Sequence, residues 1–249
     1  MGAPDKYAQI KASITEIFHR NKGRYGYRRI TLAMRAQGVT INHKTVSRLM
    51  KELGLSSKVR IRRYSSYRGE VGKTAPNILN RNFQAEAPNQ KWATDITEFS
   101  LFGEKVYLSS VLDLFNGEII SFQIERRPRL RLVTDLVEKA VRNLPDGTGL
   151  ILHSDQGWQY QHKAYRRILA TKHITQSMSR KGNCLDNAVV ENFFGHVKSE
   201  LLYLQKFQDI KQFIVELRAY LHYYNHERIK QGLNGMSPVQ FRIHSINAA

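Results

Sequence analysis

The sequence contains a single cysteine, Cys184, in 249 residues. One thiol excludes a disulfide framework within the chain and argues against a structural zinc site, which usually uses two or more thiolates. No run of 18 apolar residues occurs, and the amino-terminal residues lack the apolar stretch of a signal peptide. We therefore expect a soluble, intracellular protein with one large domain and one small one.

Acidic residues are also scarce, with 21 Asp and Glu against 39 Lys and Arg, which gives a net charge of +18. Residues 1–75 hold 17 basic and 4 acidic side chains, so +13 of this charge lies in the first third of the chain. Such an asymmetry is typical of a nucleic-acid-binding arm joined to a more neutral globular part. Composition alone leaves open a generally basic soluble protein.

Apolar spacing predicts three short helices at the amino-terminal end. They cover residues 6–21 and 27–35 and a stretch that follows Asn42, a suitable N-cap, and ends before Gly54. Three short helices joined by tight turns predict a helix-turn-helix domain, which we assign to residues 1–64. The outward face of the third helix would carry side chains that contact phosphates and base edges in a major groove, although a solvated helix face has a similar composition.

A basic stretch at residues 58–68 follows this domain and alternates with Tyr64 and Tyr67, a combination that can neutralise phosphates and stack on bases. Residues 65–88 show little periodicity and contain Gly and Pro, so we interpret them as a basic linker. We predict DNA contacts at Arg28, Arg29, Lys44, Ser47, Arg48, Lys51, Lys58, Arg60, Arg62, Arg63 and Lys198.

The pattern changes to strands at about residue 90. It predicts three strands with a hairpin at Asn116 and Gly117, and then helices alternating with short strands. The expected strands are 91–99, 105–113, 118–125, 149–153 and 174–179, and the expected helices are 129–144, 162–172, 186–204, 209–225 and 237–243. This order is that of a ribonuclease-H-like α/β domain, a mixed sheet with helices on both faces, which we assign to residues 89–249.

Three acidic residues in this domain stand in unusual surroundings. Asp95 lies within an apolar and β-branched strand, Asp155 follows an apolar strand in a polar turn, and Glu191 lies near the start of a helix. Hard divalent cations bind carboxylate oxygens, and two such ions can stabilise both oxygens of an in-line phosphodiester displacement. Singly, each acid could be an ordinary surface carboxylate, and Glu191 could simply complement its helix dipole. Asp113, at the end of the second predicted strand, is a reserve candidate for a metal ligand.

Several separated motifs then occur in a recognisable order. They are YGYRRI at residues 25–30, KTVSRLM at 44–50, WATDIT at 92–97, HSDQGWQY at 153–160, the stretch 177–191, YYN at 223–225 with Arg228, and Ser237-Pro238. Across almost the whole chain, they resemble the second-reading-frame (OrfB-type) proteins of bacterial insertion-sequence transposases of the DDE class, relatives of retroviral integrases. The 35 residues between Asp155 and Glu191 match the interval of this family.

The resemblance implies that Asp95, Asp155 and Glu191 are catalytic and bind Mg²⁺ or Mn²⁺, as two ions. Water would cleave the DNA at the element end without a covalent protein–DNA intermediate, and the freed 3′-hydroxyl would attack a second phosphate. The implied partners are terminal inverted repeats, target DNA, further copies of the chain and an upstream-frame (OrfA-type) protein. The implied location is the bacterial cytoplasm, on the nucleoid when DNA is bound.

Two other functions remain open at this point. A structure-specific nuclease of the same fold would cut DNA without joining it, and a non-catalytic DNA-binding regulator of transposition would do neither. Among the remaining residues, we expect His153 to make a structural hydrogen bond, and Trp92 and Trp158 to be core or lid residues. The His-His-Cys-Cys zinc module of the integrase relatives cannot form with one cysteine.

Overall fold

The computed structural model describes residues 5–57, 74–142, 144–145, 148–181 and 183–247. Four of the predicted DNA contacts, Lys58, Arg60, Arg62 and Arg63, lie outside these residues. None of the described helices is both long and apolar enough to cross a membrane.

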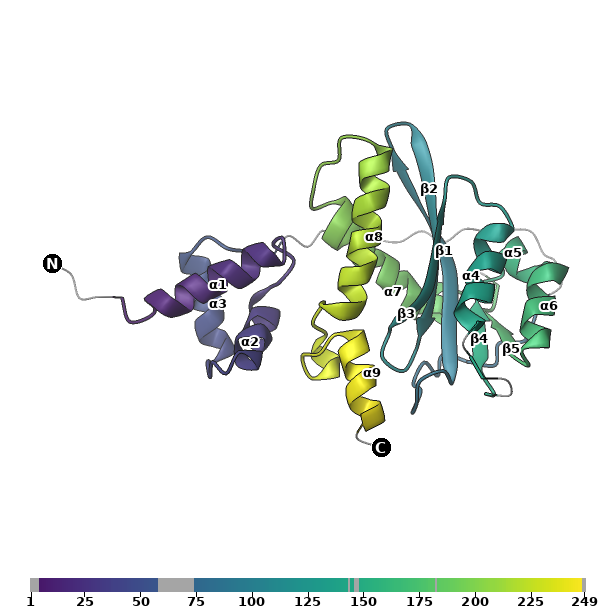
Figure 1. Cartoon of the computed structure of the whole chain (residues 1–249), viewed down its shortest axis with the longest axis horizontal. Coiled ribbons are helices and arrows are strands. Elements are labelled where there is room, and N and C mark those ends of the chain that lie inside the picture. Colours follow the sequence, from purple (N-terminus) through teal and green to yellow (C-terminus); the bar gives the residue numbers. More distant parts are fainter. Residues whose placement is uncertain (1–4, 58–73, 143, 146–147, 182, 248–249) are drawn as a thin grey trace.

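The amino-terminal unit is the expected bundle of three short helices (Figure 1). They are α1 (Ala8–Arg20), α2 (Tyr27–Ala36) and α3 (His43–Glu52). Asn42 caps α3, because its side chain accepts a hydrogen bond from the backbone N–H of Lys44. One apolar stripe from each helix forms a shared core of Ile14, Ile17, Ile30, Met34, Val46 and Leu49, all essentially buried.

A five-stranded mixed sheet forms the centre of the second unit, in the order β3-β2-β1-β4-β5. The strands are β1 (Lys91–Leu101), β2 (Glu104–Asp113), β3 (Ile119–Glu125), β4 (Ile151–Ser154) and β5 (Thr175–Met178). The first three are antiparallel neighbours, whereas β4 runs parallel to β1 and β5 runs parallel to β4. All five lie where the sequence predicted strands, and the mixed sheet confirms the expected fold class.

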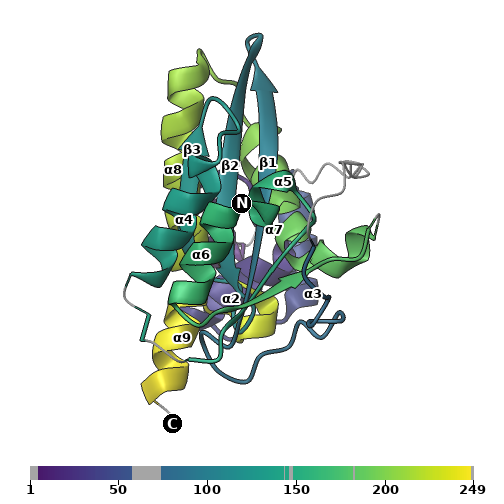
Figure 2. The same cartoon turned by 90° about the vertical axis from the view of Figure 1, so that its right-hand side faces the viewer.

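Helices cover both faces of the sheet, so that each face has its own apolar core (Figures 1 and 2). On one face lie α4 (Arg131–Val141), α5 (Trp158–Gln161) and α6 (Lys163–Thr171), and on the other lie α7 (Ala188–Val197) and α8 (Ile210–His226). A 3₁₀ turn, η3 (Gln231–Leu233), and α9 (Pro238–Asn247) close the described chain. Because the sheet is covered on both sides, an acid in its central strands is largely removed from water.

The helix expected over residues 186–204 is instead three segments. A 3₁₀ turn, η1 (Cys184–Asn187), precedes α7, and a π-helical turn, η2 (Lys198–Leu202), follows it. Hydrogen bonds to residues outside the helix explain the irregular turns at both ends. Asp186 accepts a hydrogen bond from Arg180, and Glu200 accepts one from Arg228. The prediction of one regular helix was wrong at both ends, where such long-range contacts override local preference.

The two units are packed against each other. Tyr25 donates to the carbonyl of Glu227 (3.1 Å) and accepts from the N–H of Ile229 (2.9 Å). Arg24 donates to the carbonyl of Glu200 (3.0 Å), and Tyr25 is 1% exposed. The apolar core on the α7 and α8 face continues into the three-helix bundle.

Part of the segment predicted as a linker is also attached to the sheet. The N–H groups of Ile78 and Leu79 donate to the hydroxyl of Ser177 on β5, at 3.0 and 3.2 Å. The N–H of Met178 donates to the carbonyl of Pro76 (3.2 Å). Residues 76–79 therefore follow β5, the edge strand of the sheet.

Candidate active site

The pairing of β1 with β4 brings Asp95 and Asp155 together. In these parallel strands Ala93 pairs with His153. Asp95 and Asp155 each come two residues after this pair, so the two aspartates lie side by side. Asp95 is 7% exposed, and its pKa is raised well above 3.8 by burial and by the neighbouring negative charge of Asp155. Burial also raises the pKa of Asp155. The two carboxyl groups form one closely interacting acidic pair.

Glu191 adds a third carboxyl group from the first turn of α7, which packs on β1. The pKa of Glu191 is raised by partial burial and by the charge of Asp155, and the charge of Glu191 in turn raises the pKa of Asp95. The three acids predicted from the sequence are thus brought together from a strand, a strand end and a helix.

Lys198 supplies the opposing charge. It begins η2, its Nζ lies 5.9 Å from the centre of the Phe99 ring on β1, and its charge lowers the pKa of Asp95. Lys198 lowers the pKa of Asp95 less than burial and Asp155 raise it. One lysine therefore does not balance the negative charge of the three acids.

One oxygen of each aspartate is fixed and the other is free among the described residues. Oδ1 of Asp95 accepts from the N–H of Ile96 (2.7 Å), and Oδ1 of Asp155 accepts from the N–H of Gly157 (2.9 Å). A Cβ at Gly157 would lie 3.0 Å from Oδ1 of Asp155 and 3.1 Å from Oε1 of Gln159. Glycine at this position therefore leaves room for the carboxylate.

The carboxylates are neighbours but do not form a closed cage. Among the described residues, no three His, Cys, Asp or Glu side chains are gathered tightly enough to hold an ion as they stand. The available ligands are hard carboxylate oxygens whose mutual repulsion a cation would relieve. Mg²⁺ commonly uses one or two carboxylates and retains waters or substrate oxygens, so this set fits Mg²⁺ in its donor chemistry without a complete protein cage.

His153 is structural, as the sequence analysis expected. It is fully buried, with Nδ1 at 2.8 Å from the hydroxyl of Ser177 and Nε2 at 3.2 Å from that of Ser179. Ser177 already accepts two backbone N–H bonds, so its proton points to Nδ1 and we assign the ring proton to Nε2. Burial lowers the pKa of His153, which keeps the ring neutral.

Asp186, which the sequence analysis did not single out, organises the approach to α7. Its fully buried carboxylate accepts from Nε and Nη2 of Arg180 (both 2.9 Å), from Arg81 (2.9 Å) and from Asn77 (2.9 Å). The Arg180 bonds hold the pKa of Asp186 well below its usual range. In the sequence, the one hint of this role is that Asp186 follows Arg180 by six residues, and this spacing does not predict that the two side chains pair.

Glu200 organises the other end of α7. It accepts from Nε (2.8 Å) and Nη2 (2.6 Å) of Arg228, from Tyr220 (3.0 Å) and from Arg29 (3.1 Å). Burial would raise the pKa of Glu200, but the bonds and charge of Arg228 lower it to about 2. Arg29, a predicted DNA contact, therefore lies at the junction of the two units.

The other predicted contacts of the bundle lie on its surface. Lys44, Ser47 and Lys51 are exposed on α3, and Arg28 is exposed on α2. Arg48 is exposed too, but it pairs with Glu52 and lies 5.1 Å from the centre of the Tyr7 ring. The outward face of α3 therefore carries the expected side chains, of which Arg48 already has a partner.

Two other expectations are decided by burial and bonding. Both oxygens of Asp113 accept backbone N–H bonds, from Phe115 (2.9 Å) and Asn89 (2.8 Å), so the reserve ligand serves the β2–β3 turn. Trp92 is a core residue at 1% exposure, whereas Trp158, beside Asp155, is 55% exposed.

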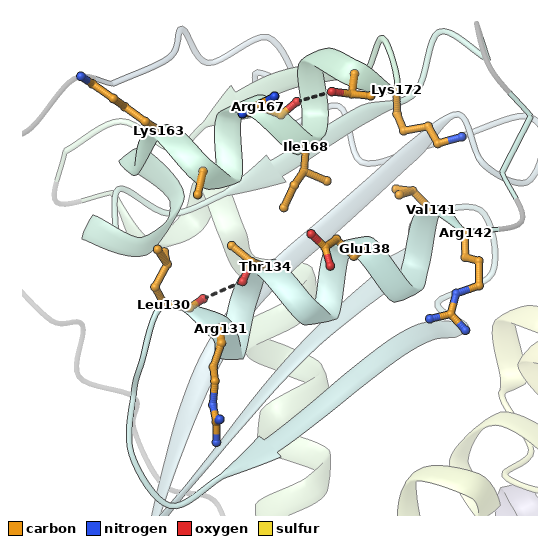
Figure 3. A pocket seen from close by; sticks show the side chains of 12 residues that line it. Leu130, Arg131, Thr134, Glu138, Val141, Arg142, Lys163, Arg167, Ile168 and Lys172 are labelled. Carbon is orange, nitrogen blue, oxygen red and sulfur yellow. Dashed lines mark hydrogen bonds between the residues drawn. The ribbon is translucent and has the colours of Figure 1, made fainter.

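A wide groove of about 980 Å³ lies between α4 and α6 and includes none of the three acids (Figure 3). Leu130, Val141 and Ile168 contribute apolar surface. Basic side chains such as Arg142 and Lys163 surround it, and Glu138 is its one acid. The acidic cluster is therefore a separate feature of the sheet.

Known families match both units. An HTH-like domain matches residues 4–64, and an integrase core domain matches in two parts, residues 85–184 and 191–246.

Similar proteins cover nearly the whole chain. The putative transposase InsK for insertion sequence element IS150 of Escherichia coli is 51% identical, over 97% of this chain and 86% of that protein. The transposase for insertion sequence element IS904 of Lactococcus lactis is 35% identical, over 93% of this chain and 92% of that protein.

Solved structures share the fold at low identity. The catalytic core domain of HTLV-2 integrase, in complex with magnesium, superposes with a TM-score of 0.50 at 19% identity, over 63% of this chain and 98% of that one. A chain of the simian T-cell lymphotropic virus intasome superposes with a TM-score of 0.52 at 16% identity, over 92% of this chain and 74% of that one.

Proposed function

The chain belongs to the insertion-sequence transposases with an integrase core domain, and we propose that Asp95, Asp155 and Glu191 form its catalytic centre for DNA strand cleavage and strand transfer. The observation that carries this assignment is the register of β1 and β4, which leads both aspartates to the same point of the sheet. Glu191 approaches that point from α7, near enough for its charge to act on Asp95.

We propose that these three side chains hold divalent cations, Mg²⁺ or Mn²⁺, as a pair. The second oxygens of Asp95 and Asp155, which have no hydrogen-bond partner among the described residues, and the carboxylate of Glu191 would be the ligands. When bound, the ions supply activation of the attacking oxygen and stabilisation of the leaving oxygen.

The chain's own groups would position the substrate. The N–H groups of Ile96 and Gly157 keep each aspartate oriented, and Lys198 would place a positive charge beside the reacting phosphate. In cleavage, the oxygen of water bonds to phosphorus and a 3′-oxygen leaves, taking up a proton. In transfer, the oxygen of that 3′-hydroxyl attacks a second phosphate, whose bond to its own 3′-oxygen breaks.

The proposed substrates are the terminal inverted repeats of the element and its target DNA. Joining two ends requires two active sites in one complex, so we propose that the chain works as a homo-oligomer on DNA. An upstream-frame protein, as partner or fusion, belongs to the same proposal. The exposed basic face of α3 supports DNA binding by the amino-terminal unit.

The test is a Mg²⁺-dependent cleavage and joining assay on labelled DNA that carries the element ends, with wild type beside Asp155→Asn. We expect wild type to cut and join, and the variant to bind the same DNA but do neither. Cleavage without joining by wild type would indicate a nuclease. Activity that survives in Asp155→Asn would refute the assigned centre.

If wild type binds the ends but neither cuts nor joins them, the assay is repeated with the upstream-frame protein added. Activity that then appears identifies a required partner. Continued inactivity favours a regulator of transposition.

A further inference from the structure

A second polar cavity, of about 340 Å³, lies on the side of α7 away from Glu191. It is partly open, and its lining comes from α2, β2, the β2–β3 turn, α7, α8 and the segment that follows α8. Three basic side chains line it, Arg29, Arg228 and Lys230, and none of its lining residues is acidic.

The positive charges around this cavity are undercompensated. Arg228 and Arg29 share one carboxylate, that of Glu200. Lys230 has no carboxylate partner among the described residues, and its Nζ donates to the carbonyls of Asn116 (3.1 Å) and Gly117 (3.2 Å). Three basic side chains thus line the cavity, and one carboxylate, that of Glu200, pairs with two of them.

This arrangement is costly for a free protein. Burial, together with the charges of Arg228 and Arg29, lowers the pKa of Lys230 to about 7. His196, which also lines the cavity, has its pKa lowered to about 4 by burial and by Arg228, so it is neutral and could accept or donate a hydrogen bond. An anion in the cavity would relieve the repulsion among the cations.

We propose that this cavity binds a phosphate of the DNA backbone, which Arg29 and Lys230 contact, while Arg228, 2% exposed and paired with Glu200, adds its positive charge beside them. The inference rests on the proposed function only in taking DNA as the substrate. Arginine offers a planar fork and lysine a compact charge, and both are common phosphate ligands. Amides of Asn192 and Gln231 also line the cavity and could donate to the same group.

The position of the site gives it a consequence for assembly. Arg29 belongs to α2 of the amino-terminal bundle, whereas Arg228 and Lys230 belong to the catalytic domain. One bound phosphate would therefore connect the two units, on the reverse side of the helix that carries Glu191. DNA seated there would add to the contacts of Arg24 and Tyr25 that already join the bundle to the unit of the active site.

The experiment scans element-end DNA with single neutral methylphosphonate substitutions, using wild type and Lys230→Gln. Glutamine keeps an N–H donor on a slightly shorter side chain, but the charge is removed. We expect one backbone position at which the substitution weakens wild-type binding roughly tenfold and leaves Lys230→Gln nearly unaffected. Arg29→Gln should lose sensitivity at the same position.

Lys211→Gln is the matched control, because it removes one exposed lysine charge from α8. It should retain the wild-type sensitivity at that position. If Lys230→Gln keeps full sensitivity at every position, the proposal is wrong. Circular dichroism checks the fold of each variant, and Arg29→Gln alone decides the question if Lys230→Gln is unfolded.

A second arm separates DNA from a free anion. Inorganic phosphate, at constant ionic strength, should raise the Tm of wild type more than that of Lys230→Gln. A result in which phosphate stabilises wild type, while no methylphosphonate position distinguishes wild type from Lys230→Gln, would show that the cavity binds a free anion and not DNA. Because both readouts measure binding, they remain informative even if Asp155→Asn shows the catalytic assignment to be wrong.

Discussion

Asp95 and Asp155 occupy matching positions on parallel neighbours, two residues beyond the pair Ala93 and His153. Strand pairing sets the backbone of Asp95 and of the residues just before Asp155, and one local N–H bond orients each carboxylate. Two acids held this close together repel each other, and a bound cation would relieve this repulsion.

The first prediction concerns stability and pH in metal-free protein. The pKa of Asp95 in the folded protein lies above its usual value of 3.8. The contribution of Asp95 to the stability of the fold is therefore complete below pH 3.8 and is lost as the pH rises through the raised pKa. Asp95→Asn removes this loss. We expect the Tm of the variant to gain on wild type as pH rises from about 4 to about 8, when unfolding is followed with a chelator present.

Added Mg²⁺ should narrow this difference by stabilising wild type more than Asp95→Asn. Asp186 and Glu200 have the opposite pH dependence, because their pKa values are lowered. Asp186 and Glu200 are present in wild type and in Asp95→Asn alike, so their contributions cancel in the difference between the two Tm values. A Tm difference that does not change with pH would contradict the assigned burial and repulsion.

The second prediction concerns the space beside Asp155. In Gly157→Ala the new methyl group would crowd Oδ1 of Asp155 at 3.0 Å, while the backbone at φ −56° and ψ 141° accepts alanine. We expect a folded protein whose cleavage rate falls more than its DNA affinity. Gly232→Ala, where the methyl group meets nothing within 4 Å, is the control and should keep wild-type activity.

The third prediction assigns Asp186 a positioning role. Asp186→Asn leaves Arg180 and Arg81 without their carboxylate and should release η1, which precedes the helix of Glu191. We expect a Tm lower by several degrees and a weaker response of cleavage to Mg²⁺, measured as a higher half-saturating concentration. Arg180→Gln should have a milder effect, because Arg81 and Asn77 remain. Equal Mg²⁺ responses in Asp186→Asn and wild type would limit Asp186 to stability.

The fourth prediction concerns Lys198. If its charge acts on the reacting phosphate, Lys198→Ala should slow single-turnover cleavage roughly a hundredfold with a smaller loss of DNA affinity. Lys198→Arg should recover part of the rate. A surface lysine lying along Phe99 would instead give equal rates in all three proteins.

The fifth prediction concerns the exposed face of α3. Lys44→Gln and Lys51→Gln should each reduce the dependence of log affinity on log salt by about one phosphate contact. Arg48→Gln should reduce it less, because Arg48 already pairs with Glu52. Point variants are preferable to removing residues 1–75, since that deletion would also uncover Glu200 and Arg228 and take Arg29 away. Unchanged slopes for both lysine variants would rule out this face as a DNA contact.

Local sequence patterns predicted most of the helices and strands and the three acids. Apolar periodicity located the three bundle helices and all five strands, because those patterns reflect which face of each element is buried. The immediate neighbours of Asp95 and Asp155 marked them as candidates, whereas Glu191 was selected because the 35 residues between Asp155 and Glu191 match the interval of the family that the chain resembles. Their role as metal ligands is still a proposal.

Contacts between distant parts of the chain, which no local pattern predicted, hold these acids in place. The bonds of Asp186 to residues 77 and 81, and those of Glu200 to Arg29 and Arg228, join parts of the chain that no local pattern relates. These contacts divide one predicted helix into three segments and place Arg29 between the two units. Such pairings depend on which distant charges meet after the sheet and its helices have packed, and a one-dimensional pattern does not contain that information.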